Sequence, residues 1–353
     1  MTSNPVRIGV LGAASIFRRK NWQAIQCSGH AVVAALATRD PARTRQFIAE
    51  RQAEAPFQAA PRVHDSYEAL IADSGIEAVY LPLPTAPRKE WVIRAAEAGK
   101  HVISEKPCAV SAADLREMLA ACRRHRVQFM DGVMFMHNPR LDRLRAVLDD
   151  PGRIGAVRRI TSDFSFLATG DFHERNIRVQ AALEPSGCLG DLGWYCVRFS
   201  LWVMRGQLPR QVTGRILTGS NGPVPLEFSG ELFFDGSASA GFHCSFLAAI
   251  QQWATISGVN GTVRVPDFVL PHTDNEVAWT VNYQPVRKAD TGLYLDTPTT
   301  ARSQETLMFR NFADQVRSGT LNDEWAEAAL KTQQVVDACA ASARAGGRME
   351  AVV

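Results

Sequence analysis

Apolar runs alternate with helical patterns through the first third of the chain, from Val6 to about Arg126. Parallel strands joined by crossover helices produce this alternation, because each connecting helix covers one face of the sheet. The alternation predicts a doubly wound parallel sheet of the α/β class, which we assign to a Rossmann dinucleotide-binding domain over residues 1–126. The expected strands lie at 6–11, 31–37 and 78–85, and a fourth follows Gly99.

The first apolar run ends in a turn of small residues, and the segment that follows, through Cys27, can be helical. A turn of this kind points backbone N–H groups and the positive end of a helix dipole at a pyrophosphate. The glycine pattern is imperfect, because Ala14 and Phe17 occupy the second and third glycine positions counted from Gly12, so a plain strand-to-helix turn stays open. Gly9 would be a close-packing glycine of the strand, and the candidate cofactor residues are Gly9, Gly12, Ala13, Ala14, Ser15 and Ile16.

The second run ends in Thr38, Arg39 and Asp40, at the point where dinucleotide folds select their cofactor. An acidic residue directly at this strand end would bind the ribose hydroxyls of NAD, whereas a hydroxyl and a guanidinium suit the 2′-phosphate of NADP. Asp40 lies one residue late and precedes Pro41, which is typical of the cap of a helix, here over residues 42–52. Thr38 and Arg39 therefore favour NADP, with a solvated surface arginine as the alternative.

The run after Gly99 delivers Glu105 and Lys106 to the carboxyl end of a strand, and Pro107 stops the strand there. Ligands bind at this end of an open α/β sheet, so the lysine can reach a bound substrate. The proline makes the following turn rigid, and a cis peptide bond is possible between Lys106 and Pro107. An exposed lysine beside a turn is the alternative. The preceding helix is expected over residues 88–98, with Gly99 as its C-terminal cap.

The second half of the chain has short strands between Gly, Asn, Pro and Asp turns, which predicts a large antiparallel or mixed sheet. One face is expected to lie under the helix near Asp191, and the other face, with its aromatics, to pair with a second subunit. Residues 279–300 are expected to form a loop, and two closing helices are expected over 304–318 and 324–344. The second domain spans residues 127–353, with strands expected at 154–166, 211–218, 226–234, 237–246, 253–257 and 262–265.

Five ordered motifs resemble the Gfo/Idh/MocA family of oxidoreductases. They are the 82–85 run with Glu90 and Trp91, the 99–107 run, and the segments 134–139, 176–178 and 187–195. The last segment is most similar to the branch that contains dimeric dihydrodiol dehydrogenases and sugar-oxidising members. The resemblance implies a Rossmann domain followed by a C-terminal domain on a large, mostly antiparallel sheet, and a homodimer or homotetramer formed through that sheet. It also implies cofactor contacts from Pro82, Leu83, Pro84, Thr85, Glu105 and Lys106.

The same resemblance implies three catalytic residues, which are Lys106, Asp191 and Tyr195. Asp191 would orient the substrate hydroxyl, and Tyr195 would be the general acid/base, where many members carry histidine. The two residues are four apart, so they can share one helical face. Oxidation of a secondary alcohol needs a group that takes the hydroxyl proton, and tyrosine, with a pKa near ~10, needs a neighbouring cation such as Lys106 for this role. A helix cap for Asp191 and a core aromatic for Tyr195 are the structural alternatives.

The three catalytic residues are also expected to bind substrate, and three other polar residues are candidates beside them. Asn176 and Arg178 lie just upstream of the catalytic stretch, where they either bind substrate hydroxyls or tether the loop. His137 either faces the substrate or stacks beside Pro139. Met136 occupies the place where the family more often has an arginine, which weighs against an anionic substrate.

The composition narrows the class of protein further. The 39 basic and 36 acidic residues leave a net charge of +3, which is no footprint of nucleic-acid binding. Seven cysteines without a Cys-x-x-Cys pair fit reduced thiols, and no cluster has the spacing of a metal site. Neither a signal peptide nor a membrane-spanning run is recognised, so a cytoplasmic location is expected.

The sequence thus predicts an enzyme that transfers hydride between NADP, or NAD, and a secondary hydroxyl or ketone of a sugar, sugar derivative or cyclic polyol. Oxidation of a trans-1,2-dihydrodiol is the alternative within redox chemistry. Two alternatives come from other classes. One is a redox-neutral enzyme that retains its cofactor and works through transient oxidation; the other is a cofactor-sensing binding protein, which the complete proton-transfer set disfavours.

Overall fold

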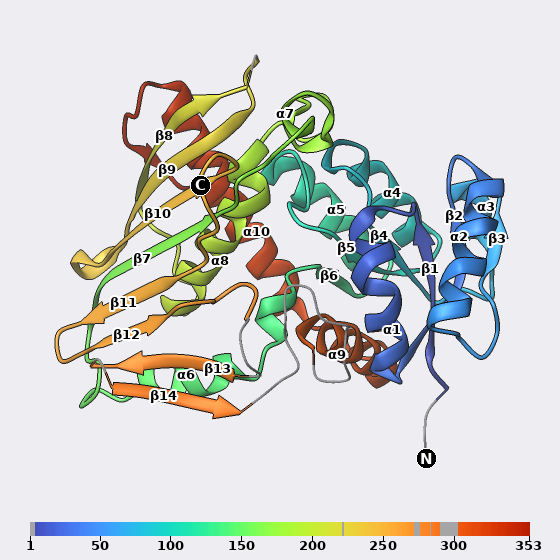
Figure 1. Ribbon diagram of the computed structural model, residues 1–353, viewed down its shortest axis with the longest axis horizontal. Helices are drawn as coiled ribbons and strands as arrows, with labels where there is room; N and C mark the ends of the chain where they lie inside the picture. Colours follow the sequence, from blue (N-terminus) through green and yellow to red (C-terminus); the bar gives the residue numbers. More distant parts are fainter. Residues whose placement is uncertain (1–3, 221, 272–275, 283, 290–302) are drawn as a thin grey trace. The chain divides into compact units, whose positions relative to one another are not determined.

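The computed structural model describes residues 4–220, 222–271, 276–282, 284–289 and 303–353 (Figure 1). The chain divides into two compact units, each made of segments that are far apart in the sequence. Of the described residues, the first unit comprises 4–108, 113–138 and 303–327, and the second comprises 109–112, 139–220, 222–271, 276–282, 284–289 and 328–353.

The first unit is built on a six-stranded parallel sheet with the strand order β3-β2-β1-β4-β5-β6. The order reverses direction between β1 and β4, and the carboxyl ends of strands at such a switch point are where open α/β sheets bind ligands. The predicted doubly wound parallel sheet is confirmed. Its strands are β1 (Val6–Leu11), β2 (Ala31–Ala37), β3 (Arg62–His64), β4 (Ala78–Leu81), β5 (His101–Ser104) and β6 (Phe129–Asp131).

Helices cover both faces of this sheet, and one of them returns from the end of the chain. Helix α9 (Gln304–Ser318) packs beside α1 (Trp22–Ser28), and its Phe309 and Phe312 are fully buried in the core of the first unit (Figure 1). The predicted limits of α9 are confirmed. The other helices of this unit are α2 (Pro41–Glu54), α3 (Tyr67–Ala72), α4 (Thr85–Glu97) and most of α5 (Ala112–Arg124).

Local signals set the ends of α2 and α4. The Asp40 carboxylate accepts a hydrogen bond of 3.0 Å from the Arg43 amide, which confirms the predicted cap. Helix α4 starts at Thr85, three residues earlier than predicted, because a proline in the first helical turn, here Pro87, lacks only an amide that would have no helical partner. Its cap is Ala98, and Gly99 follows with a φ of +72°.

The second unit is built on a nine-stranded sheet in its described part, with the order β14-β13-β12-β11-β7-β10-β9-β8-β15. The pair β7 and β10 is parallel, and the other described pairs are antiparallel, so the sheet is mixed, as one of the two predicted forms. Its strands are β7 (Val157–Ser165), β8 (Gln211–Gly219), β9 (Pro225–Phe233), β10 (Ser239–Ser245), β11 (Ala254–Gly258), β12 (Thr262–Val265), β13 (Glu276–Val281), β14 (Gln284–Ala289) and β15 (Glu350–Ala351).

One part of this sheet contradicts the sequence prediction. The segment expected to be a loop over 279–300 instead contributes to the hairpin of β13 and β14, and its remainder from 290 lies outside the described residues. Pro285 made the segment resemble a loop, but a proline is tolerated in an edge strand, where one row of amides has no partner strand.

Helix α8 (Trp194–Val203) covers one face of the nine-stranded sheet, as predicted. It follows a π-helical turn, Leu189–Gly193, in which Gly193 lies against Cys244 and Phe242 of β10. The last turns of α10 (Asp323–Arg344) pack on the same sheet, where Ser342 accepts a hydrogen bond of 2.9 Å from the Gly214 amide. Two shorter helices of this unit are α6 (Arg140–Leu148) and α7 (Phe172–Arg175).

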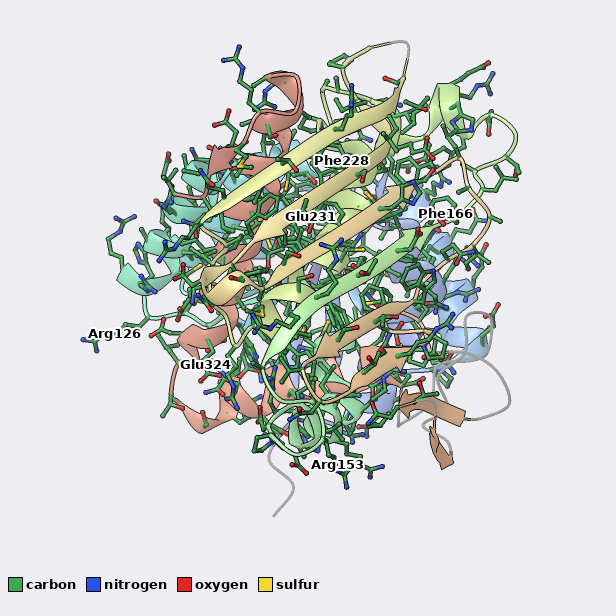
Figure 2. All side chains as sticks on the ribbon, turned by 90° about the vertical axis from the view of Figure 1, so that its left-hand side faces the viewer. Arg126, Arg153, Phe166, Phe228, Glu231 and Glu324 are labelled. Carbon is green, nitrogen blue, oxygen red and sulfur yellow. The ribbon has the colours of Figure 1, made fainter. Side chains whose placement is uncertain are left out.

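No helix of the described residues lies over the opposite face of the sheet (Figure 2). Phe228 and Phe242 stack on each other and are buried on the α8 side. Alternate residues of a strand point to opposite faces, so the outer positions of β9 include the partly exposed Phe233 beside polar residues. The polar residues of this face extend to the neighbouring strands. They include Arg159, which pairs with Glu231, and His243.

None of the described helices is long and apolar enough to span a membrane. All seven cysteines are free thiols, and six of them are buried. Burial raises the pKa of Cys122 to about 12, which disfavours a reactive thiolate there.

Candidate active site

The turn after β1 holds the residues that the sequence predicts to contact the cofactor. Gly12 has a φ of +97°, and a side chain there would start 3.1 Å from Leu83. Gly9 is a close-packing glycine, since a Cβ on it would lie 2.5 Å from Leu70. The four residues after Gly12 are partly or fully exposed. The helix that begins among them has a 3.1 Å hydrogen bond from the Arg18 amide to the Ala14 carbonyl. Those four residues are Ala13, Ala14, Ser15 and Ile16.

The end of β2 separates two residues that the sequence treated together. The Thr38 hydroxyl contacts the Thr44 hydroxyl at 2.5 Å and accepts a 3.1 Å bond from the Asp40 amide, so it belongs to the helix cap. Arg39, at the same strand end, is exposed to solvent.

Tyr67, which the sequence analysis missed, lies between these two features. Its hydroxyl is 3.6 Å from where a side chain on Gly12 would start, and its ring packs edge-on against Trp91 with centroids 4.9 Å apart. Burial raises the pKa of Tyr67, and the nearby charge of Arg39 opposes that shift. Arg39 and Tyr67 are thus two side-chain donors beside this turn, whereas the Gly12 amide donates to the Ala37 carbonyl at 2.8 Å.

The turns that follow β4 and β5 are joined by Arg88, which is 3% exposed. Its guanidinium donates to the carbonyl of Leu83 at 2.8 and 2.5 Å, to that of Glu105 at 2.7 Å, and to that of Pro107. The Thr85 hydroxyl also reaches the Pro107 carbonyl, at 3.4 Å. The turn of Pro82, Leu83, Pro84 and Thr85 is thus tied to the turn that carries Lys106, and the bond from Lys106 to Pro107 is cis.

Glu105 belongs to a second network beneath Lys106. The buried Tyr80 hydroxyl donates to Glu105 Oε1 at 2.6 Å, and the Asn21 amide donates to the Tyr80 oxygen at 2.6 Å. Burial raises the pKa of Glu105, and the hydrogen bond from Tyr80 and the charges of Arg88 and Lys106 oppose that shift. The carboxylate at the end of β5 is therefore a partner of protein groups rather than of solvent.

In the second unit, Asp191 is fixed by an ion pair. The Arg178 Nε donates to Asp191 Oδ2 at 2.7 Å, and the two side chains are 43% and 14% exposed. The Asn176 side chain accepts a 3.1 Å bond from the Arg178 amide, which caps the short turn that carries the arginine. The charge of Asp191 raises the pKa of Arg178, which favours the charged guanidinium.

Tyr195 lies one helical turn after Asp191, in the first turn of α8. It is 6% exposed, and its ring packs edge-on against Phe164 of β7 with centroids 5.4 Å apart. Its charge, when ionised, also acts on Arg178, which places the phenol in the same electrostatic environment as the Arg178–Asp191 pair. The second unit therefore brings Arg178, Asp191 and Tyr195 together.

His137 belongs to the first unit. Its Nδ1 contacts the Asn311 amide at 3.0 Å, and its ring packs against Trp325 with centroids 5.8 Å apart. These two contacts tie His137 to α9 and to the start of α10.

Besides Tyr67, sequence reasoning missed Arg88, Tyr80 and Asn21 of the first unit. A cation in the first turn of a helix opposes the helix dipole, so Arg88 carried a readable signal that it must have other partners. A tyrosine within a fully buried strand also needs a partner for its hydroxyl, which applies to Tyr80. Their partners come from distant parts of the chain and could not be identified from spacing.

Family models match both units. Residues 6–133 match a model described as the oxidoreductase family with an NAD-binding Rossmann fold. Residues 142–264 match a GFO/IDH/MocA C-terminal domain, and residues 222–351 match an oxidoreductase-family C-terminal alpha/beta domain.

Three curated proteins are similar along most of the chain. A dTDP-3,4-didehydro-2,6-dideoxy-alpha-D-glucose 3-reductase from Saccharopolyspora spinosa is 30% identical over 95% of each chain. D-xylose 1-dehydrogenase (NADP(+)) 2 from Haloferax volcanii is 29% identical over 97% of this chain and 98% of its own. The human trans-1,2-dihydrobenzene-1,2-diol dehydrogenase is 30% identical over 69% of this chain and 68% of its own.

A solved structure has the same fold. It is that of a 3-ketoreductase from Actinomadura kijaniata in complex with NADP and TDP-benzene. The TM-score is 0.82 and the sequence identity is 24%, over 96% of this chain and 98% of the other.

Proposed function

Because the chain belongs to the Gfo/Idh/MocA family of oxidoreductases, we propose that it transfers hydride between NADP and a secondary hydroxyl or ketone of a sugar, a sugar derivative or a cyclic polyol. The relatives act on such groups: one is a reductase of a nucleotide-linked keto sugar and another is a D-xylose dehydrogenase. Family membership alone does not select the substrate, since one fold hosts many specificities.

The observation that carries this proposal is the fixed carboxylate of Asp191 next to Tyr195. An ionised carboxylate accepts hydrogen bonds only, so Asp191 held by Arg178 would accept a hydrogen bond from a substrate hydroxyl other than the one that loses its proton, and so orient the substrate. Tyr195, one turn later, would take the hydroxyl proton during oxidation and return it during reduction. We assign Asp191 to substrate orientation and Tyr195 to general acid/base catalysis on this basis.

Lys106 completes the proposed catalytic set. A tyrosine is a weak base near neutral pH, and a lysine ammonium close to the phenolate would favour the ionised form. We propose that Lys106 has this role and also binds the substrate oxygen. Asn176, Arg178 and His137 are proposed as weaker contributors to substrate binding, with Arg178 acting chiefly through Asp191.

NADP is the proposed cofactor because Arg39 offers an exposed guanidinium at the end of β2. The pyrophosphate would lie on the turn from Gly12 to Ile16, and Tyr67 would face the adenosine side of the same turn. When bound, the nicotinamide accepts or supplies the hydride. The segments Pro82–Thr85 and Glu105–Lys106 are proposed to contact the nicotinamide half.

A substrate panel tests the function directly. The purified protein is mixed with NADP or NAD and with pentoses, hexoses, anhydrosugars, inositols, nucleotide-linked sugars and a trans-dihydrodiol, and nicotinamide absorbance is followed. We expect multiple turnovers with one sugar or polyol class and faster turnover with NADP. Absence of turnover in both directions, with cofactor retained through purification, would favour the redox-neutral alternative instead.

A second candidate is oxidation of a trans-dihydrodiol, which the similarity to the human dihydrodiol dehydrogenase favours. Both substrate types present a secondary hydroxyl on a ring, so the same residues would serve. The panel separates them, because turnover confined to the dihydrodiol would replace the sugar proposal.

We also propose a cytoplasmic homo-oligomer of two or four copies, with functional domains at 1–126 and 127–353. The uncovered face of the nine-stranded sheet, on which Glu231 lies (Figure 2), supports the assembly, because it presents a partly exposed surface that includes the Arg159–Glu231 ion pair. Size measurement by light scattering tests it.

A further inference from the structure

Arg88 is a buried cation whose hydrogen bonds all go to backbone carbonyls. Its guanidinium contacts the carbonyls of Leu83, Glu105 and Pro107. The last two are the carbonyls on either side of Lys106, so one side chain holds both ends of the dipeptide that carries the lysine. The Leu83 carbonyl belongs to the turn after the neighbouring strand, β4.

The geometry suits an arginine and no other residue. A guanidinium presents five N–H donors in a rigid plane, whereas a lysine ammonium is a point charge on a flexible stem. Buried carbonyls at strand ends need donors, and here a single planar group serves three of them. Lysine at this position would reach fewer of the carbonyls and would leave the two turns free to move apart.

The location of Arg88 has an electrostatic cost that the contacts offset. It lies in the first turn of α4, where the helix dipole disfavours a cation, and it is 3% exposed. Its charge acts on Glu105, whose carboxylate is the acidic group at the end of β5. In this buried position, the charged Arg88 ties the two turns together in a way that a neutral side chain would not.

We propose that Arg88 is a positioning residue, which couples the turn Pro82–Thr85 to Lys106 so that the cofactor contact and the lysine hold one fixed arrangement. This inference rests on the proposed function, which makes the turn a cofactor contact and Lys106 a catalytic residue. A bound cofactor that orders the turn Pro82–Thr85 would then also fix Lys106.

The test compares Arg88→Met and Arg88→Lys with the matched control Arg94→Met. Arg94 is on the same helix, but it is 44% exposed and pairs with Glu68 and Glu90 on the surface. Three readouts are used: the dissociation constant of NADP from fluorescence, the rate of amine acylation of Lys106 with and without NADP from mass spectrometry, and the pH dependence of kcat.

We expect NADP to slow acylation of Lys106 in the wild type and in Arg94→Met. In Arg88→Met, saturating NADP should no longer protect the lysine, and kcat should fall about 10²-fold, as for a catalytic group displaced by about 1 Å. The pH profile of kcat should shift upward, because a displaced lysine stabilises the phenolate less. Arg88→Lys should be intermediate in all three readouts.

Full protection of Lys106 in both Arg88 variants, with an unshifted pH profile, would overturn the proposal. If Arg88→Met fails to fold, as judged by circular dichroism, Arg88→Lys decides with the same readouts. The proposed function fails separately, when the wild type turns over no substrate of the panel. The acylation comparison needs no turnover and still tests the coupling in that case.

Discussion

The turn that carries Lys106 and the segment that carries Asp191 are both held by an arginine, but in different settings. Arg88 is 3% exposed and donates to backbone carbonyls, whereas Arg178 is 43% exposed and pairs with a side-chain carboxylate. Salt weakens a half-exposed ion pair, while a buried guanidinium on carbonyls is screened much less. The first setting fixes the backbone, and the second fixes one side chain.

This difference suits the parts that the two regions are proposed to bind. A protein that binds one cofactor needs a binding site of constant shape. The hydrogen bonds from Arg88 to backbone carbonyls fix the two turns themselves, and not only single side chains. Substrates differ among the relatives, which include a keto-sugar reductase, a xylose dehydrogenase and a dihydrodiol dehydrogenase. The Arg178–Asp191 pair fixes one carboxylate and not the surrounding backbone, so it constrains its neighbours less than Arg88 does.

The sharpest way to separate the two regions is Tyr195→Phe. The substitution removes the proton donor and acceptor from the second unit, and general acid–base catalysis typically contributes about 10²- to 10⁴-fold. We therefore expect kcat to fall by at least about 10²-fold. The dissociation constant of NADP should stay within about twofold of the wild-type value, because the cofactor turns lie in the other unit.

The control for this substitution is Phe164→Leu, which changes the ring that packs on Tyr195 but leaves the hydroxyl. Phe164→Leu should clearly lower the free energy of unfolding and should lower kcat only slightly. Equal losses of kcat in the two variants would show that packing, rather than proton transfer, explains the effect of Tyr195→Phe.

Arg39→Ala makes the opposite break, in the first unit. A charge-assisted hydrogen bond contributes about 1.5–3 kcal/mol, so NADP should bind about 10-fold or more weakly, while NAD binding should hardly change. At saturating NADP, kcat should remain near the wild-type value. The measurement is a pair of fluorescence titrations, with Arg43→Ala as an exposed control on the next helix. Equal weakening of NADP and NAD would exclude Arg39 as the group that binds the 2′-phosphate.

Much of the fold follows from sequence pattern, because burial imposes a period on each strand and helix. The limits of β2, β12 and α9 agree with the predicted ranges, and Asp40 marks the start of α2. The β13–β14 hairpin was missed because Pro285 in an edge strand is indistinguishable from a proline in a loop until the strand order is known.

The candidate site was less accessible to sequence reasoning. The motif positions of Lys106, Asp191 and Tyr195 are local, so the resemblance could supply them. The partners of these residues are not local: Arg178 is 13 residues from Asp191, and Tyr80 is 25 residues from Glu105. Hydrogen bonds of this kind depend on which strands become neighbours, and no sequence period encodes that pairing.

Glu105→Gln gives the smallest expected effect and tests how rigid the first region is. Because burial raises the pKa of Glu105, the folded state binds the carboxyl proton more tightly than the unfolded state does. The contribution of Glu105 to the free energy of unfolding is therefore lost as pH rises through its folded pKa. The glutamine has no such titration. The stability of Glu105→Gln relative to the wild type should therefore increase from pH ~4 to pH ~8, by an amount on the order of 1 kcal/mol, from denaturant midpoints. Glu50→Gln, which changes an exposed glutamate of α2, should show no such trend. A difference that is flat with pH for Glu105→Gln as well would mean that the carboxylate beneath Lys106 is solvated, and that only Arg88 makes the first region more rigid than the second.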